Sequence, residues 1–182
     1  MRLLLLLTAI LLTACGGPPD VYAPPIARKP MDVYGADLMG SFTPFGTANS
    51  AMHIVGGVDT TIMSGAWRWA FPHAELRFYL PGAKGWNARM EFAIAKTILD
   101  KTGPQTLTLF VNNNQVDQLR YERDGNYIWD RPIPENLLVP AGMNYLRIEV
   151  DKTAPDETHR QLGFILTRAG FTHPDQKPPA AK

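Results

Sequence analysis

The chain has 182 residues, of which 45% are apolar, and it carries 18 basic residues against 17 acidic ones. This length suits one medium-sized domain with a substantial core. The balanced charge gives no electrostatic reason to expect a nucleic acid or an anionic membrane surface as partner, so nucleic-acid binding is excluded from the expected functions.

The first residues indicate an export signal. One positive charge at Arg2 is followed by an apolar run over residues 3–12 and then by small residues. The run is too short to cross a bilayer, which takes about 20 residues in a helix. We therefore expect a cleaved signal peptide over residues 1–14.

The segment Leu12-Thr13-Ala14-Cys15 holds the single cysteine of the chain. It resembles the lipobox of bacterial lipoproteins, in which Leu, a small residue, and Ala or Gly precede a cysteine. The resemblance implies that Cys15 is diacylated on sulfur, becomes the first residue after cleavage, and often gains a further acyl chain. Two or three acyl chains anchor a protein stably, whereas one does so only marginally. The alternative is a secreted protein with a free thiol near its terminus.

Proline-rich segments flank the expected domain. The stretch "GGPPDVYAPPIARKP" has no apolar periodicity, and its prolines favour extended polyproline II, so residues 15–32 are expected to form a lipid-anchored tether. The tail over residues 172–182 is equally rich in breakers and is expected to be disordered. Residues 33–171 remain for one β-sandwich domain.

Apolar residues recur at every second position in this domain, which predicts strands. In "AELRFYL", Leu76, Phe78 and Leu80 face one way, while Arg77 and Tyr79 face the other. Similar patterns predict strands in "ARMEFAI", "QTLTLFV" and "QVDQLRY" and over residues 127–133, 144–150 and 162–168, with weaker patterns around 51–55 and 66–70. Residues 93–101 fit either a helix or a strand end followed by a loop. About eight short strands with turn residues between them favour an all-β, antiparallel β-sandwich.

The order of segments over residues 67–171 resembles the galactose-binding-domain-like jelly roll. The matching positions are Val111-Asn112-Asn113, Trp129, Pro134, Leu137-Leu138, Gly142, Asn144, Leu146, Ile148 and Val150. The resemblance implies a jelly-roll β-sandwich, but no single ligand, because the superfamily includes sugar binders, lipid binders, protein docks and structural domains. The hairpin of the family usually has Asn-Gly at its tip. This chain has Asn112-Asn113-Asn114-Gln115, which leaves a longer turn or another turn type open.

No sequence pattern indicates an enzyme, a cofactor or a metal, and we expect none of them. Ser64-Gly65 lacks the first glycine of a nucleophile elbow, and the four histidines stand singly, without zinc-ligand spacing. The loop carboxylates Asp37, Asp59 and Asp151 lack the dense oxygen-ligand pattern of a calcium site. The cluster "APDETHR" fits either a ligand-binding or acid/base loop or a solvated loop in which Arg160 pairs locally, and we favour the solvated loop.

The tryptophans are the best candidates for ligand contacts, because indole faces stack on the C–H groups of sugars. Trp86, within "PGAKGWNAR", is expected in an exposed loop. Trp67 shares one face of a strand with Trp69, so the two are either ligand contacts or core. The expected ligand-binding set is Trp86, Trp129, Trp67, Tyr79, Arg77 and Asn87. For each tryptophan, packing in the core is the alternative.

Together these features predict a non-catalytic envelope lipoprotein, anchored in a membrane through the lipid on Cys15, whose sandwich binds a glycan. Gly16 follows the cysteine at a position where Asp would favour inner-membrane retention in enteric-type bacteria, so the outer membrane is expected where two membranes exist. The alternative is a docking or assembly subunit of an envelope protein complex. A hydrolase ranks last.

Overall fold

The computed structural model describes residues 39–175. All described residues belong to one compact unit. The predicted signal peptide, the acylation of Cys15, and the tether over residues 15–32 lie outside the described residues. Between residues 39 and 175, no helix has the length and apolar character needed to cross a bilayer.

The described chain is built almost entirely of antiparallel strands. In chain order they are β1 (Phe42–Pro44), β2 (Ile54–Val58), β3 (Arg68–Leu80), β4 (Asn87–Ile94), β5 (Gln105–Val111), β6 (Asn114–Tyr121), β7 (Gly125–Pro132), β8 (Gly142–Val150), β9 (Ala154–Pro155), β10 (Gln161–Leu162) and β11 (Phe164–Thr172). The short helices are η2 (Ala48–His53), α2 (Lys96–Thr102) and η3 (Glu135–Leu137). The predicted all-β, antiparallel jelly-roll sandwich is confirmed, with nine strands in the main sheet of the described region.

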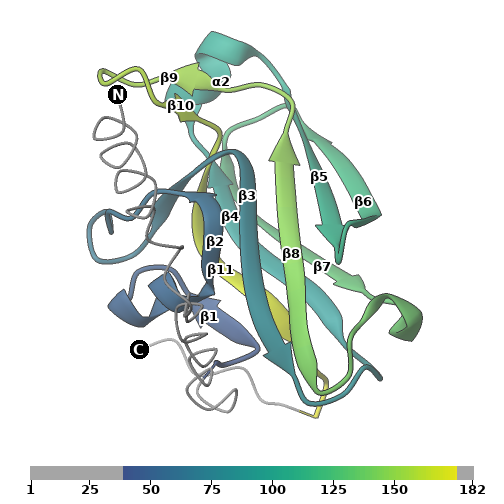
Figure 1. Ribbon diagram of the computed structural model, residues 1–182. Helices are drawn as coiled ribbons and strands as arrows, with labels where there is room; N and C mark the ends of the chain where they lie inside the picture. The colour runs from purple at the N-terminus through teal and green to yellow at the C-terminus, as the bar shows by residue number, and fades with distance from the viewer. Residues whose placement is uncertain (1–38, 176–182) are drawn as a thin grey trace, which may run out of the picture. The chain divides into compact units, whose positions relative to one another are not determined.

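Two layers of strands face each other in Figure 1. The layer that we call the front sheet has the order β2-β3-β8-β5-β6, and the back sheet has β11 between β4 and β1, with β7 beyond β4. The long strand β3 joins them, because its first residues pair with β11 and its later residues pair with β8. Pro72 lies between these two pairings, where the missing N–H of proline removes no ladder hydrogen bond.

The core lies between the layers and follows the alternation of the sequence. Leu76, Phe78 and Leu80 of β3 are fully buried, and so are the inward rows of the neighbouring strands, namely Met90, Phe92 and Ile94; Leu107, Leu109 and Val111; and Leu146, Ile148 and Val150. At the far edge, the two sheets approach between β6 and β7. There Asp117 accepts a hydrogen bond from the indole N–H of Trp129 (2.8 Å) and pairs with Arg131.

The structure decides three local questions that the sequence leaves open. Residues 93–101 contain the end of β4 and then a true helix, α2. The segment around residues 51–55 is not one strand: the 3-10 helix η2 occupies it up to His53, and β2 follows. The segment at 66–70 is the beginning of the 13-residue strand β3.

The β5–β6 hairpin has a tight two-residue turn, although it has no glycine. Val111 pairs with Asn114, and the two residues between them, Asn112 and Asn113, have φ of 47° and 66°. Positive φ at both central residues is the geometry of a type I′ turn, which asparagine tolerates better than most residues. The Asn112 side chain also donates to the carbonyl of Leu137 (2.7 Å) and so fixes the loop opposite.

Asn144 has a structural role. Its side chain is fully buried, accepts from the backbone N–H of Val139 (2.8 Å) and donates to the Val139 carbonyl (2.9 Å). The loop between η3 and β8 is therefore held by one amide side chain.

Candidate functional site

The expectation that Trp86 lies in an exposed loop is wrong. Its side chain is 3% exposed, and its backbone carbonyl accepts a hydrogen bond from the N–H of Ile133 (2.9 Å), directly before β4. The ring of His173 covers it at a centroid distance of 5.2 Å. Trp129 is 1% exposed. Neither indole offers a free face to a sugar, because both fill the sandwich core.

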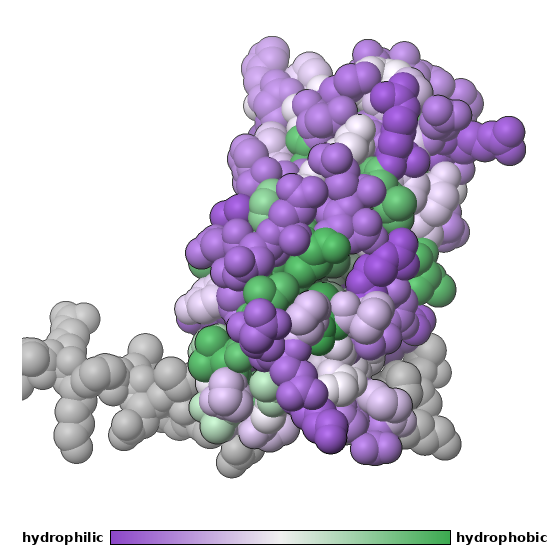
Figure 2. Space-filling view, turned by 90° about the vertical axis from the view of Figure 1, so that its right-hand side faces the viewer, coloured by the Kyte–Doolittle hydropathy of each residue, from purple (hydrophilic) through white to green (hydrophobic). Residues whose placement is uncertain are grey.

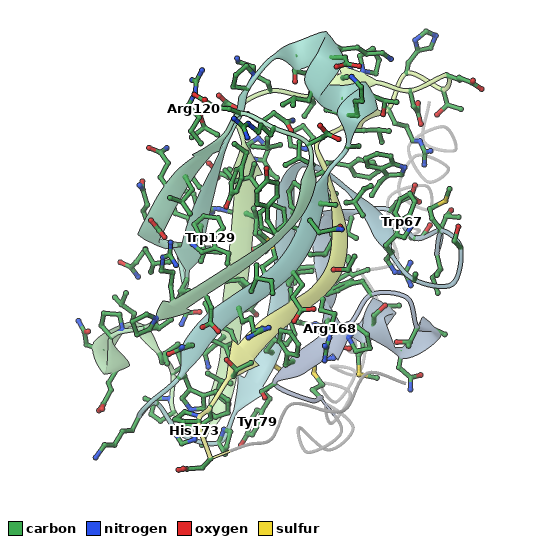
Figure 3. All side chains as sticks on the ribbon, turned by 180° about the vertical axis from the view of Figure 1, so that it is seen from behind. Trp67, Tyr79, Arg120, Trp129, Arg168 and His173 are labelled. Atoms are coloured by element: carbon green, nitrogen blue, oxygen red, sulfur yellow. The ribbon has the colours of Figure 1, made fainter. Side chains whose placement is uncertain are left out.

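The other predicted ligand residues are accessible but do not converge. Figure 3 shows Trp67, Tyr79 and Trp129 at three separate places in the domain. Tyr79 and Arg77 lie on the outer face of the front sheet, where Arg77 donates to the carbonyl of Met52 (3.0 Å). Asn87 begins β4 on the back sheet and donates to Asp130 (2.7 Å). The six residues therefore do not form one site.

A different place has the features of a binding site. A hollow of about 720 Å³ opens at the end of the sandwich where α2 and the β9–β10 hairpin lie (Figure 1). We call it the end hollow. The residues that matter most in its lining are Met63, Trp69, Ile98, Lys101, Asp156 and Arg160. Its volume is in the range of known small-ligand pockets.

Apolar side chains form one part of the end hollow. Ile98 of α2, Ala154 of β9 and Leu162 of β10 are buried together in a small second core, with Trp69 and Phe71 half-buried against it. Trp69 reaches this end because it faces away from the main core, whereas its neighbours Arg68 and Ala70 face inward. The ring of Trp67 packs edge-on against Trp69 at 5.3 Å, which fixes the orientation of both indoles.

Charged side chains form the other part, and Arg160 is at their centre. Its Nη1 donates to Asp59 Oδ2 at 2.5 Å, and its Nη2 lies 2.8 Å from Asp156 Oδ2. Asp59 belongs to the segment after β2 and is only 6% exposed, so Arg160 joins the β9–β10 hairpin to a distant part of the chain. We call this arrangement the Arg160 clamp.

The tip of the β9–β10 hairpin is exposed to solvent and is held by its own hydrogen bonds. One carboxylate oxygen of Asp156 accepts from the backbone N–H groups of Thr158 (2.8 Å) and Arg160 (2.9 Å) and from the Thr158 hydroxyl (2.8 Å). His159 takes a positive φ of 63° to close the turn. The expectation of a solvated loop with a locally paired Arg160 is confirmed, and Arg160 pairs with Asp59 in addition.

Both carboxylates of the clamp remain ionised well below neutral pH. Partial desolvation alone would raise the pKa of Asp156, but the Thr158 hydroxyl, the Arg160 amide and the Arg160 guanidinium together lower it to about 2. Burial would likewise raise the pKa of Asp59, but the Thr61 amide and the Arg160 guanidinium outweigh burial and lower it. The clamp is a stable ion pair at physiological pH.

Apolar and polar side chains meet in the end hollow. The end hollow combines an indole, a methionine, an exposed lysine and ordered carboxylates, so it offers an apolar surface beside hydrogen-bond donors and acceptors. Within residues 39–175, no group of histidine, cysteine, aspartate or glutamate side chains is placed to hold a metal ion. Asp59 and Asp156, the ordered acids here, are both occupied by Arg160.

The sequence leaves Trp69 open between a ligand contact and a core residue, and it does not reveal the distant partner of Arg160. Trp69 alternates with the inward residues Arg68 and Ala70, so the period-two pattern of "WRWAF" could have placed its side chain on the outward face. Asp59 and Arg160 are 101 positions apart in the sequence, and no local pattern predicts their ion pair.

Comparisons with known proteins give a likeness at low identity only. No protein-family model matches the chain, and no curated protein matches it. A family 35 carbohydrate-binding module from an environmental isolate is 15% identical, with a TM-score of 0.39, over 78% of this chain and 93% of that one. A family 35 module from Clostridium thermocellum is 12% identical, with a TM-score of 0.43, over 71% and 96%.

An acetyl xylan esterase, Est2A, from the rumen bacterium Butyrivibrio proteoclasticus is 12% identical, with a TM-score of 0.41. The match covers 76% of this chain but only 34% of the esterase. At such identities and TM-scores, these likenesses carry no conclusion about ligand or activity.

Proposed function

We propose that this protein is a lipid-anchored envelope lipoprotein that binds a glycan, without catalysis, in the end hollow. The observation that carries the proposal is the half-buried indole of Trp69 beside the Arg160 clamp. Sugars present C–H faces that pack on an indole and hydroxyl groups that bond to charged and polar side chains around it. Both kinds of contact meet in this one hollow.

The rigidity of the hollow supports binding. Trp69 is held by Trp67 and by the small core below it, and the hairpin carrying Asp156 and Arg160 is fixed at both ends. A site whose side chains are already ordered loses less conformational entropy when a ligand arrives. We infer that the ligand meets a largely preformed surface.

The membrane anchor is a proposal from the sequence. Cys15 ends the Leu-Thr-Ala-Cys segment, and acylation there would attach the domain to the envelope, in the outer membrane where two membranes exist. Labelling of cells with a palmitate analogue tests this. We expect label on the wild-type chain and none on Cys15→Ala, together with release of Cys15→Ala from the membrane fraction. Equal labelling of the two would contradict the anchor.

A docking role is the second candidate, and one surface favours it. Figure 2 shows apolar side chains gathered in the middle of the face at the right of Figure 1, where β6 and β7 lie. Val116, Leu119 and Tyr127 are only partly buried there, and Ile128 is 64% exposed. An exposed apolar surface of this kind is typical of protein contacts. We call it the β6–β7 face.

One pair of variants separates the two candidates. The full-length chain, purified in detergent, is applied to immobilised xylan, galactan, mixed-linkage glucan and peptidoglycan. If the glycan proposal holds, Trp69→Ala loses retention and Ile128→Ser keeps it. If docking is the function, the wild-type chain is not retained on any glycan, and Ile128→Ser loses an envelope protein that crosslinks to the wild-type chain in cells.

A further inference from the structure

A second hollow lies on the outer face of the front sheet, away from the core. Four polar side chains stand there in one row across four strands: His73 of β3, Glu149 of β8, Thr108 of β5 and Gln118 of β6. The pairing fixes the row, since His73 lies opposite Glu149, Glu149 opposite Thr108, and Thr108 opposite Gln118. With strands about 4.8 Å apart, the row extends roughly 14 Å across the sheet. We call it the polar row.

The polar row lines a groove of about 410 Å³. Its side chains are close to one another but remain accessible. Gln118 Nε2 donates to the Thr108 hydroxyl at 2.9 Å, and His73 Nδ1 lies 3.6 Å from Glu149 Oε1, with 69% of the His73 side chain exposed. Donors and acceptors therefore alternate along an open groove, which is the arrangement that sugar hydroxyls need.

The next row of the same face supplies a flat surface. Phe110 lies opposite Arg147, and the guanidinium carbon of Arg147 is 4.4 Å from the centre of the Phe110 ring. Arg147 Nε also lies 3.1 Å from Glu149 Oε1, so the positive charge of Arg147 offsets the negative charge of Glu149. The charge that remains in the lining of the groove is the carboxylate of Asp151, which accepts a hydrogen bond from the backbone N–H of Thr106 (2.7 Å), and the groove has a planar, partly apolar border.

The outer face of the back sheet differs. Asp130 pairs with Arg89 (3.2 Å), Arg89 with Glu91 (3.0 Å), and Glu91 with Arg168 (3.7 Å). Those four side chains form consecutive ion pairs, so each charged group already has a partner. The polar row instead contains two uncharged groups, Thr108 and Gln118, whose hydrogen bonds are made to each other at an exposed position and can be exchanged for those of a ligand.

The groove and the end hollow are neighbours. Thr153 lines the groove and Pro155 lines the end hollow, and the two residues are two positions apart on the segment that enters β9. In an extended chain, two positions correspond to roughly 7 Å. One polysaccharide chain can therefore contact both places, which an isolated sugar unit cannot.

We propose that the polar row is a second glycan-binding subsite, which takes an uncharged stretch of the polysaccharide whose other part occupies the end hollow. The inference rests on the proposed glycan function. Two linked contacts raise the affinity for a polymer through effective concentration, without raising the affinity for a short sugar that fills one site. The polar row thus makes the protein selective for long chains.

The test compares long and short probes on full-length protein in detergent. The probes are xylan, galactan and mixed-linkage glucan, each with its own trisaccharide. The variant is Thr108→Val with Gln118→Ala, and the matched control on the back sheet is Asn126→Ala with Thr172→Val. For the retained polymer, we expect the variant to lose affinity about tenfold or more, with trisaccharide affinity unchanged and the control unaffected.

Each result has a clear meaning. Equal polymer affinity of the variant and the control overturns the second subsite, even if Trp69→Ala still abolishes all binding and the end hollow stands. Loss of trisaccharide affinity in the variant overturns it too, because the polar row would then be part of one single site. If Trp69→Ala binds like the wild-type chain, the end hollow fails. If no probe is retained by the wild-type chain, both proposals fail.

Discussion

Arg160 and Asp59 are 101 positions apart in sequence and 2.5 Å apart in space, and this ion pair holds the β9–β10 hairpin against the segment that follows β2. Asp59 is almost fully buried, whereas Arg160 is partly exposed. A buried carboxylate that loses its cation is costly, so this contact contributes more than an ordinary surface pair. It is the element that shapes one wall of the end hollow.

Replacement of this buried carboxylate should loosen the hairpin without unfolding the sandwich. Asp59→Asn keeps the acceptor for the Thr61 amide (2.9 Å) but removes the charge opposite Arg160. We expect faster amide hydrogen exchange in β9 and β10, unchanged exchange in β5 and β8, and about tenfold weaker glycan binding. Asp100→Asn is the control, since its partner Lys96 is exposed. Unchanged exchange in β9 and β10 would contradict the role of the clamp.

Arg68 should be one of the most sensitive positions of the domain. It is 2% exposed and donates to the carbonyls of Phe45 (3.1 Å), Asp59 (3.1 Å) and Thr60. Arg68→Met leaves these carbonyls unpaired, so we expect the free energy of unfolding to fall by about 3 kcal/mol. Urea denaturation measures the change. Arg120→Met, on the exposed face of β6, should change it by less than about 0.5 kcal/mol, and equal effects at the two positions would contradict this account.

His53 should make the stability depend on pH. Burial lowers its pKa below 6.5, although its Nδ1–H donates to the Arg77 carbonyl (3.0 Å), and its ring stacks on Phe78. Because the unfolded chain binds this proton more readily, stability is fully present above pH 6.5 and is lost as the pH falls below that value. Urea midpoints at pH 7.5 and pH 5 should differ less in His53→Gln than in the wild-type chain. The same pH dependence in both chains would rule out His53 as its source.

The turn at Asn112 and Asn113 predicts different effects on the free energy of unfolding for two substitutions of Asn113. Asn113 has φ of 66°, which costs an alanine about 1 kcal/mol and a glycine nothing. We expect Asn113→Ala to lower the free energy of unfolding by about that amount and Asn113→Gly to leave it unchanged or raise it. Thermal unfolding of the two variants decides the point. If Asn113→Gly lowered the free energy of unfolding, the hydrogen bond between Arg147 and the Asn113 side chain (3.0 Å) would contribute more than the backbone preference for glycine.

Much of the fold follows from local sequence patterns. Strand positions and inward rows are encoded within a few residues, because alternation and turn chemistry act locally. The helix α2 is harder to predict, since its one fully buried residue, Ile98, packs on β9 and β10, far along the chain. Its helical pattern is too short to exclude the alternative interpretation, a strand end followed by a loop.

The candidate site is less predictable than the fold. Trp86 follows Gly82 and Gly85 and precedes a polar residue, which are marks of an exposed loop, yet the fold places its indole in the core under His173. Trp69 and Asp59 gain their importance from segments brought together only in the folded chain. Single-residue types identify candidates, but the convergence of side chains depends on long-range topology.

The most direct measurement of the central claim compares the indole N–H signals of the four tryptophans. The indole N–H signals of the full-length, ¹⁵N-labelled chain in detergent are followed by NMR during titration with the polysaccharide that retains it. We expect Trp69, and Trp67 packed against it, to shift in proportion to binding. The buried Trp86 and Trp129 should stay unmoved. Binding that shifts neither Trp67 nor Trp69 would contradict the end hollow as the glycan site.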